Sequence, residues 1–268
     1  MYLSRVLIVL ISLSSVYTKT NNDKRNFDTR KNKRIQNRIV GIHNYFRSKV
    51  QPTASNMLAL SWSVEAANMA QKHADACEFG RHSTIELRKS NKFKQCGESL
   101  SIYDVRDPRA DWLNAIKLWY DEKSLFQYGG NLTWLQQNFL RVGHYTTLMW
   151  ATTSHVGCAY ARCSNDTTNT RRNFSFHNFV CAYCPIGNDS EYINKPYKKG
   201  KACADCPNHC FQKTLCLNRC PVYNNYGPKY CNKEDGDLFR WYPDGCKDKY
   251  VREQCKATCR CGKSRIYW

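Results

Sequence analysis

The cysteines are the residues of this chain whose type and spacing suggest chemistry most directly. There are 16 of them among 268 residues. Two C-x2-C pairs, Cys181/Cys184 and Cys203/Cys206, stand 18 residues apart, which is a spacing that suits a four-cysteine zinc site. An even number of cysteines also suits a set of disulfides, provided that the chain folds in an oxidising compartment. The choice between thiolate ligands and disulfides therefore depends on where the protein folds.

The amino terminus and four sequons indicate a secretory route. A short positive segment ends at Arg5, an apolar run covers Val6–Val16, and polar residues follow to residue 20, as in a signal peptide spanning 1–20. The apolar run is too short to cross a bilayer, so we do not expect an integral membrane protein. Sequons predict glycosylation at Asn131, Asn165, Asn173 and Asn188. We therefore expect a secreted, extracellular protein whose cysteines form disulfides.

A second stretch with chemical potential is Gly143–Trp150. It places a histidine, two threonine hydroxyls and a tryptophan in eight residues, just before a run typical of a strand, His155–Cys163. The sequence contains no G-x-S-x-G nucleophile motif, and no two histidines have the H-x3-H interval of a helical metal site. We therefore expect a binding protein rather than an enzyme.

Positive charge is concentrated at the two ends of the chain. The formal net charge is +19; Lys19–Arg38 has eight basic and two acidic residues, and Glu191–Trp268 has 16 and eight. A basic secreted protein favours anionic partners such as glycans, acidic channel mouths or anionic membrane surfaces, and we do not expect nucleic acid. Residues 21–38 have almost no apolar side chains, so we expect a disordered basic arm or a pro-segment, with a dibasic cleavage point at Lys33-Arg34. A solvated arm is favoured over a heparin-binding one.

The hydrophobic pattern predicts three helices in the first half. Apolar residues from Ile39 have helical spacing, and this helix should end before Pro52. Ser63 can cap a second helix that continues through Cys77. Asp107-Pro108 supplies a capping carboxylate followed by proline at the first helical position, and the apolar face of this third helix runs from Trp112 to Tyr120.

Two strands are expected after these helices, at Val156–Arg162 and Asn173–Tyr183. Helices followed by paired strands predict an α+β domain in which helices cover an antiparallel sheet. From residue 191 the composition changes to lysine, proline and cysteine. We expect a linker at 191–202, a disulfide hinge at 203–220 and a small module at 221–268, none of which can form a core without crosslinks.

Six segments resemble, in order, the signature segments of a known family. They are Ile39–Asn44, Ala54–Leu58, Cys96–Leu100, Trp119–Glu122, Gly143–Trp150 and Phe179–Asn188. This set is similar to the CAP superfamily and, with the cysteine-rich tail, to the cysteine-rich secretory proteins. The resemblance implies a CAP (SCP) domain at 39–190 with an α-β-α sandwich, then a hinge and an ion-channel-regulator module that folds like the ShK toxin. Ser99 stands where the family usually has asparagine, and Thr147 where it often has glutamine.

The resemblance also implies a disulfide pairing, which the spacing alone leaves open. The implied pairs are Cys77–Cys163, Cys96–Cys184, Cys158–Cys181, Cys203–Cys210, Cys206–Cys216, Cys220–Cys261, Cys231–Cys255 and Cys246–Cys259.

A cleft tetrad of two histidines and two glutamates is a further implication of the resemblance. It corresponds to His82, Glu98, Glu122 and His144. Two neutral imidazoles in a polar cleft suit a divalent transition metal, so we expect weakly bound zinc on His82 and His144. In the alternative interpretation, the glutamates only tie loops together and the histidines line a wet groove.

The implied function is modulation or block of a calcium or potassium channel by the C-terminal module. Lys249 and Tyr250 occupy the segment where related toxin folds carry a lysine followed by an aromatic residue, and Phe239 and Trp241 are further contact candidates. Two alternatives stay open. One is a reproductive or extracellular-matrix protein whose CAP domain binds a glycan, sterol or protein ligand. The other is a metal-dependent hydrolase.

Overall fold

The computed structural model of this chain describes residues 27–164, 174–262 and 265–267. The expected signal peptide and the sequons at Asn165 and Asn173 lie outside these residues. The helices are α2 (Lys33–Arg47), α3 (Val64–Ala76), α4 (Trp112–Asp121), α5 (Leu132–Gln137), α6 (Phe139–Met149), α7 (Pro228–Cys231), α8 (Asp237–Trp241), α9 (Lys249–Gln254) and α10 (Lys256–Arg260). The strands are β1 (Ser61–Trp62), β2 (Gly97–Asp104), β3 (His155–Cys163), β4 (Phe176–Cys184), β5 (Cys210–Phe211) and β6 (Leu215–Cys216). Among the described residues, no helix is both long and apolar enough to cross a bilayer.

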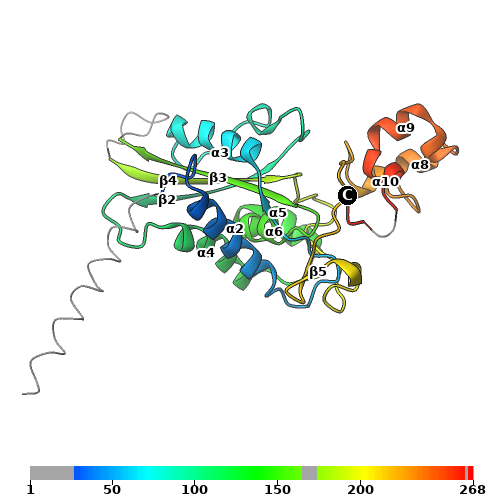
Figure 1. Ribbon diagram of the computed structural model, residues 1–268, viewed down its shortest axis with the longest axis horizontal. Coiled ribbons are helices and arrows are strands. Elements are labelled where there is room, and N and C mark those ends of the chain that lie inside the picture. The colour runs from blue at the N-terminus through cyan, green and yellow to red at the C-terminus, as the bar shows by residue number, and fades with distance from the viewer. Residues whose placement is uncertain (1–26, 165–173, 263–264, 268) are drawn as a thin grey trace, which may run out of the picture.

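The large domain is built on a four-stranded sheet in the order β1-β3-β4-β2 (Figure 1). Strand β4 pairs antiparallel with both β2 and β3, whereas the short β1 pairs parallel with β3. Alternate side chains of β3 and β4 enter two separate cores. The core beneath α2, α4 and α6 receives Val156, Cys158, Phe179, Cys181 and Tyr183. The core beneath α3 receives Ala159, Val180 and Ala182. Both faces of the sheet are covered, so the expected α-β-α sandwich is confirmed.

Helix α3 lies close to strand β3 because a glycine stands at their contact. A side chain on Gly157 would place its Cβ only 2.1 Å from the backbone nitrogen of Ala67, so any other residue would push the helix off the sheet. The helix is capped by Ser63, whose side chain accepts the N–H of Ala66. It ends at Cys77, which has a left-handed backbone with a φ of 54°. Both ends agree with the helix predicted from Ser63.

Helix α4 begins later than the predicted start at Asp107-Pro108. Its first residue is Trp112, and the side chain of Asp111 caps it. The Asp107 carboxylate instead accepts the backbone N–H of Arg109 at 2.9 Å and the Nε–H of the same residue at 3.0 Å. Asp107 therefore closes a turn ahead of the helix, because an arginine two residues on occupies its carboxylate.

The expectation of a disordered arm is wrong for the part of it that the structure describes. The Phe27 side chain is buried, and its carbonyl accepts the indole N–H of Trp112 at 3.1 Å. The Thr29 hydroxyl is also buried and donates to the carbonyl of Cys158 at 2.6 Å. A polar segment with a single large apolar residue is thus anchored on the sheet, because that residue fills a place in the core.

Helix α2 accordingly begins at Lys33 rather than near Ile39. The side chain of Asn32 caps it by accepting a backbone N–H of the first turn. The dibasic pair Lys33-Arg34 lies inside this first turn. Cleavage there would remove the start of the helix together with the buried Phe27.

A buried arginine ties helix α2 to the end of α6, to the loop that follows α6 and to the segment at Leu58. Arg47 is 1% exposed and donates six hydrogen bonds to backbone carbonyls. The accepting residues are Leu58, which accepts two, and Leu148, Trp150, Ala151 and Thr153. A guanidinium has five N–H groups and no acceptor, so this carbonyl cage suits it better than any other side chain.

Every cysteine of the chain is in a disulfide, and the pairs are the same as those that the resemblance implies. They are Cys77–Cys163, Cys96–Cys184, Cys158–Cys181, Cys203–Cys210, Cys206–Cys216, Cys220–Cys261, Cys231–Cys255 and Cys246–Cys259. The cysteines of the two C-x2-C pairs belong to four different disulfides. They offer no thiolates to a zinc ion, which removes the four-cysteine alternative.

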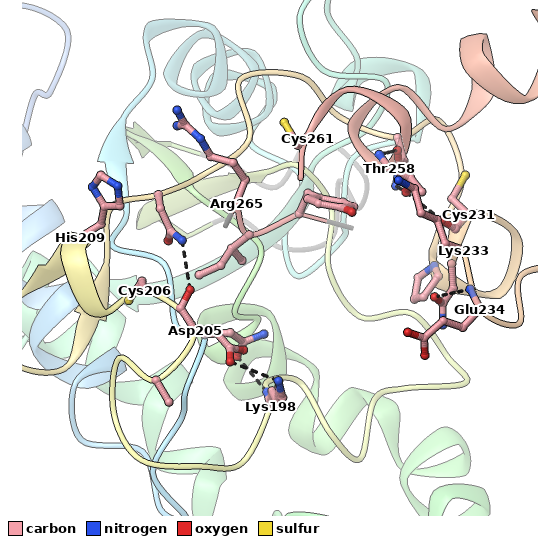
Figure 2. A pocket seen from close by; sticks show the side chains of 18 of the residues that line it. Lys198, Asp205, Cys206, His209, Cys231, Lys233, Glu234, Thr258, Cys261 and Arg265 are labelled. Carbon is pink, nitrogen blue, oxygen red and sulfur yellow. Dashed lines mark hydrogen bonds and ion pairs between the residues drawn. The ribbon is translucent and has the colours of Figure 1, made fainter. Parts of the chain in front are cut away.

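The segment expected to be a linker, residues 191–202, instead packs against the large domain. Ile193 and Tyr197 are buried, and the carbonyl of Pro196 accepts the N–H of Ala151 at 2.8 Å. Two apolar side chains are enough to hold this lysine-rich segment in place. A cavity of about 920 Å³ lies nearby, between the large domain, the hinge and the C-terminal module (Figure 2).

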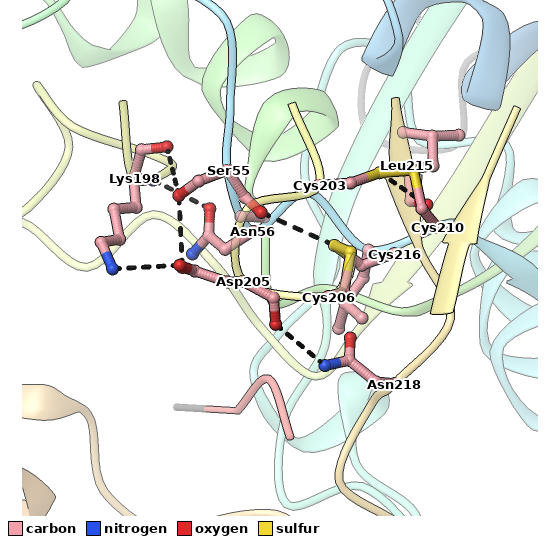
Figure 3. The surroundings of a disulfide bond; sticks show 12 residues. Ser55, Asn56, Lys198, Cys203, Asp205, Cys206, Cys210, Leu215, Cys216 and Asn218 are labelled. Carbon is pink, nitrogen blue, oxygen red and sulfur yellow. Dashed lines mark hydrogen bonds and ion pairs between the residues drawn. A yellow bond between two sulfur atoms is a disulfide. The ribbon is translucent and has the colours of Figure 1, made fainter. Parts of the chain in front are cut away.

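The hinge pairs with an edge of the large domain (Figure 3). The N–H of Cys216 donates to the carbonyl of Met57 at 2.7 Å. The Asp205 carboxylate accepts the Ser55 hydroxyl at 3.2 Å and the Lys198 ammonium at 3.1 Å. The hinge is therefore an extension of the large domain, held by backbone pairing and one charged contact.

The C-terminal module folds around a few buried side chains and three disulfides. Its core consists of Cys231, Leu238, Val251 and Cys255. Four short helices, α7 to α10, surround this core (Figure 1). Because this core is so small, we expect the crosslinks to supply most of the stability of the module.

The hinge and the module meet the large domain around a buried histidine. The Arg219 guanidinium donates to Nε2 of His155, and the hydroxyls of Ser154 and Tyr223 lie 3.0 and 3.3 Å from its Nδ1. The Tyr223 ring also packs against Phe93, with centroids 5.5 Å apart. Burial, and then the charge of Arg219, lower the pKa of His155 to about 4, so this imidazole is neutral at pH 7.

Candidate functional site

The four residues of the predicted tetrad meet in one cleft of the large domain. His82 lies in the loop after α3, Glu98 on β2, Glu122 just after α4 and His144 on α6. The two imidazole centroids are 5.9 Å apart. Nδ1 of His82 is 3.1 Å from a Glu98 oxygen, and Nδ1 of His144 is 2.7 Å from a Glu122 oxygen. The fold therefore brings together two histidine–carboxylate pairs from four separate elements.

Glu98 is buried, and its carboxylate is surrounded by donors. It accepts Nδ1–H of His73 at 2.9 Å and both the N–H and the hydroxyl of Ser83 at 3.0 and 2.7 Å, besides its contact with His82. Burial opposes ionisation, but the hydrogen bonds from the histidines and Ser83 outweigh it and hold the pKa of Glu98 well below its usual range. Glu98 is thus a charged anchor for His82 rather than a proton donor.

Sequence reasoning missed His73. Burial lowers the pKa of this histidine, but the hydrogen bond and the charge of Glu98 raise it more, so the net direction is upward. His73 lies on the buried stripe of α3 with Ala66, Met69, Ala70 and Ala74. A histidine on an apolar stripe needs a buried partner, and this signal could have identified it.

Glu122 orients the second histidine of the cleft. Besides Nδ1 of His144, its carboxylate accepts the backbone N–H of Tyr145 at 3.0 Å, so the carboxylate is fixed against helix α6. Nε2 of His144 is buried and has no hydrogen-bond partner among the described residues. A carboxylate on Nδ1 keeps the proton there and leaves the lone pair of Nε2 available.

This donor arrangement fits a metal ion. Oriented imidazoles whose Nδ1 contacts a carboxylate are the usual way in which proteins prepare histidine for zinc. Two such ligands, His82 and His144, leave further coordination positions to water or a ligand. Two other groups place three potential ligand atoms together, His43 with Cys158 and Cys181, and Cys203 with Cys206 and Cys216, but their sulfurs are all in disulfides. Within the described residues, the histidine pair is therefore the better candidate.

The cleft around the histidines has a volume of about 320 Å³. Its rim carries four exposed apolar side chains: Ile85, Phe139, Leu140 and Ile186. Its floor contains three glycines, of which Gly187 packs so closely on Trp150 that a Cβ would lie 2.4 Å from the indole. Two oriented histidines under an apolar rim can bind a ligand, and no serine or cysteine is among the described residues that line this cleft.

Glycosylation at Asn188 is incompatible with this fold. Its side-chain N–H groups donate to the carbonyl of Gly143 at 2.9 Å and to the hydroxyl of Thr147 at 2.6 Å, so the nitrogen that would carry a glycan is fully used. Asn131, in contrast, is exposed and uses only its side-chain oxygen, which accepts the N–H of Trp134. Asn131 stays a predicted glycosylation site.

Three of the four channel-contact candidates are exposed on the C-terminal module. Lys249 is the first residue of α9, and Tyr250 and Trp241 are 43% and 64% exposed. Phe239 instead packs on the module core, where a Cβ on Gly245 would lie 3.3 Å from its ring. Phe239 therefore has a structural role, because the module has few other apolar side chains.

The exposed rings belong to an aromatic group that extends to the large domain. Tyr226, Tyr230 and Trp241 follow one another with centroids 5.4 and 6.4 Å apart, and Tyr250 lies 5.7 Å from Tyr242. The Lys94 ammonium of the large domain stands 4.4 Å above the Tyr226 ring. Sequence reasoning missed Tyr226 and Tyr230, since only the fold brings them beside Trp241.

Both parts of the chain match known families. Residues 40–183 match the cysteine-rich secretory protein family (CAP), and residues 203–266 match the Crisp family. Cysteine-rich secretory protein 2 of Homo sapiens is 39% identical over 233 residues, which cover 87% of this chain and 86% of the human protein. Cysteine-rich secretory protein 1 of Macaca mulatta is 38% identical over 229 residues, covering 85% and 82%.

Solved structures give the same result for the fold. The crystal structure of NaASP2 with Zn²⁺ superposes with a TM-score of 0.56 at 28% identity, covering 70% of this chain and 98% of that one. The structure of BmVAL-1 has a TM-score of 0.51 at 28% identity, covering 68% and 92%. With the sandwich, the eight disulfides and relatives that match over most of its length, this chain belongs to the cysteine-rich secretory protein family.

Proposed function

We propose that this is a secreted protein that binds a cation channel through its C-terminal module and modulates or blocks it. The observation that supports this proposal is the exposed pair Lys249 and Tyr250 at the start of α9, on a module held by three disulfides. A lysine ammonium is a compact cation that can enter a pore, with the neighbouring ring at its rim. A crosslinked module also loses little conformational entropy on binding.

Patch-clamp recording of the full-length protein against a panel of potassium and calcium channels tests this proposal. We expect Lys249→Ala to weaken block about 30-fold, because losing a desolvated charge contact costs about 2 kcal/mol or more. The matched control is Lys195→Ala, an exposed lysine on the large-domain side. We expect that control to change potency less than about twofold.

Two outcomes would contradict channel binding through this site. Equal potency of the two variants would make Lys249 an ordinary surface lysine. Absence of block on every channel of the panel would favour a matrix-binding role of the CAP domain instead.

A second proposal concerns the CAP cleft, where we infer a weak zinc site on His82 and His144. Its support is the unpartnered Nε2 of His144 beside two carboxylate-oriented imidazoles. NaASP2, a protein of the same fold, was crystallised with Zn²⁺. We propose ligand binding rather than turnover at this cleft, since no activated nucleophile accompanies the metal site.

Calorimetry with zinc tests the cleft directly. We expect roughly micromolar binding by the wild type and none by the double variant His82→Ala, His144→Ala. The melting temperature should change little on chelation, because the disulfides already hold the domain. Unchanged zinc binding by the double variant would refute the assignment.

A further inference from the structure

Helix α2 presents a basic face that belongs to neither of the two proposed sites, the C-terminal module and the CAP cleft. Residues 31–49 contain six lysines and arginines and no acidic residue. Arg47 is buried, whereas Lys31, Lys33, Arg34, Arg38 and Lys49 are exposed. With 100° per residue, Arg34, Arg38 and Tyr45 fall within about 40° of one another, opposite the buried face of His43 and Arg47. Lys49 follows just beyond the end of the helix.

A row of rings extends this face to the neighbouring helix. The Lys49 ammonium lies 5.5 Å from the Tyr45 ring, which contacts Phe46 at 5.6 Å. Phe46 stacks on Tyr120 of α4 at 4.3 Å. The Lys123 ammonium then stands 4.4 Å above the ring of Tyr120. Tyr45 itself is 59% exposed.

The acids that stand next to this row along the chain are already engaged. Asp28 pairs with Arg30 at 2.8 Å, Asp121 pairs with Lys117 at 2.5 Å, and Glu122 accepts from His144 in the cleft. Within the described part of the chain, Lys31, Lys33, Arg38 and Lys49 make no ion pair with a carboxylate. The face is therefore a band of cations with an exposed ring among them.

We propose that this face, formed by Lys31, Arg38, Tyr45, Lys49 and Lys123, binds a sulfated polysaccharide. The cations would pair with sulfate groups, and the exposed Tyr45 ring would stack on a sugar. The face is elongated, as a site for an extended polysaccharide must be, since the helix between Arg34 and Tyr45 alone spans about 16 Å. Because the fold already holds these cations in a fixed array, binding a polysaccharide would require little further ordering of the protein.

The chemistry of the face favours a sulfated glycan over two other polyanions. A membrane-binding helix needs large apolar side chains on the face that it inserts, and here Tyr45 is the exposed ring among the cations. We do not expect DNA or RNA as the partner, because disulfide-bonded proteins belong mainly to oxidising compartments outside the cytosol and nucleus. A sulfated chain combines dense charge with sugar rings, and it therefore matches both components of the face.

Binding of the full chain to a heparin-derived octasaccharide, measured by calorimetry at several salt concentrations, tests this proposal. The test variant is Arg38→Gln with Lys49→Gln, two exposed residues outside the CAP cleft and the module. The control is Lys201→Gln with Lys247→Gln, which removes the same charge from two other exposed sites. We expect the test variant to bind about tenfold or more weakly and the control less than twofold. The slope of the logarithm of the binding constant against the logarithm of the salt concentration should fall by about two, and only in the test variant.

Tyr45→Ala gives a second readout that net charge cannot explain. It should weaken octasaccharide binding about threefold or more while the salt dependence stays the same, because no cation is removed. Equal affinities of the test and control variants would overturn the proposal, as would absence of wild-type binding near physiological salt. Equal binding to a desulfated octasaccharide, or tighter binding to duplex DNA or to anionic lipid vesicles, would overturn it as well. Circular dichroism of each variant checks that the fold is kept.

Discussion

Acid should weaken the contact between the large domain and the C-terminal region, through His155. The folded structure holds this imidazole neutral, because the guanidinium of Arg219 donates to its Nε2. Tyr223 and Phe93 cover the ring, and Lys92 adds a second positive charge nearby. A proton on His155 would remove the acceptor for Arg219 and place two cations in contact.

The size of the effect follows from the pKa. Folding lowers the pKa of His155 from 6.5 to about 4, so the unfolded chain binds the proton more tightly than the folded one. The free energy of unfolding is therefore unaffected above pH 6.5 and falls as the pH decreases from 6.5 to 4. At about 1.4 kcal/mol for each unit of pKa, the full loss is about 3 kcal/mol. For a chain of this size, that corresponds to roughly 6–12 °C in melting temperature.

The comparison that isolates this histidine is wild type against His155→Gln. Glutamine keeps an oxygen that can accept from Arg219 but does not titrate. His43, which is buried with a pKa lowered to about 4, is present in both proteins and cancels. Melting temperatures measured between pH 7 and 4.5 should fall more steeply for the wild type. Parallel curves for the two proteins would refute the reasoning.

Three further predictions test the packing. Arg47→Met should lower the free energy of unfolding by at least about 3 kcal/mol in denaturant titrations, since five carbonyls lose their donor, while the exposed Arg38→Met should change it by less than about 0.5 kcal/mol. Gly187→Ala should lower the free energy of unfolding by about 1–3 kcal/mol, because the new methyl meets Trp150. Gly41→Ala has open space around its methyl and should raise the free energy of unfolding by about 0.5–1 kcal/mol. The same titrations measure both variants, and equal effects would contradict the packing. Thiol titration of the denatured, unreduced protein should find about zero free thiols, and several would contradict the pairing.

Local signals in the sequence predicted three helices and two strands of the large domain, but not α5, α6 or β2. Ser63 is followed by an apolar stripe, so the start of α3 could be identified from neighbouring residues alone. The start of α4 could not, because Asp107 and Asp111 are both good caps and only the contact with Arg109 decides between them. Phe27 shows the same limit, since its partners lie far away in the chain.

The cleft was predictable as a set of residues but not as a network. A resemblance can identify all four residues, and motif segments carry three of them directly: Glu98, Glu122 and His144. It does not show that Glu98 is shared with His73, 25 residues away along the chain. The glycosylation sequon at Asn188 illustrates the reverse error, because a correct local motif there conflicts with hydrogen bonds that only the fold creates.

The carbonyl cage of Arg47 has a consequence for how the large domain opens. The loop from Trp150 to Thr153, which follows helix α6, and the segment at Leu58 are irregular, and irregular segments usually fluctuate independently of one another. Here both depend on one guanidinium that is rooted in helix α2. If either segment moves away, the buried guanidinium of Arg47 loses part of its hydrogen-bond acceptors. We therefore expect the two segments to open together or not at all. Amide hydrogen exchange should therefore find helix α2 and these two loops in a single cooperative unit.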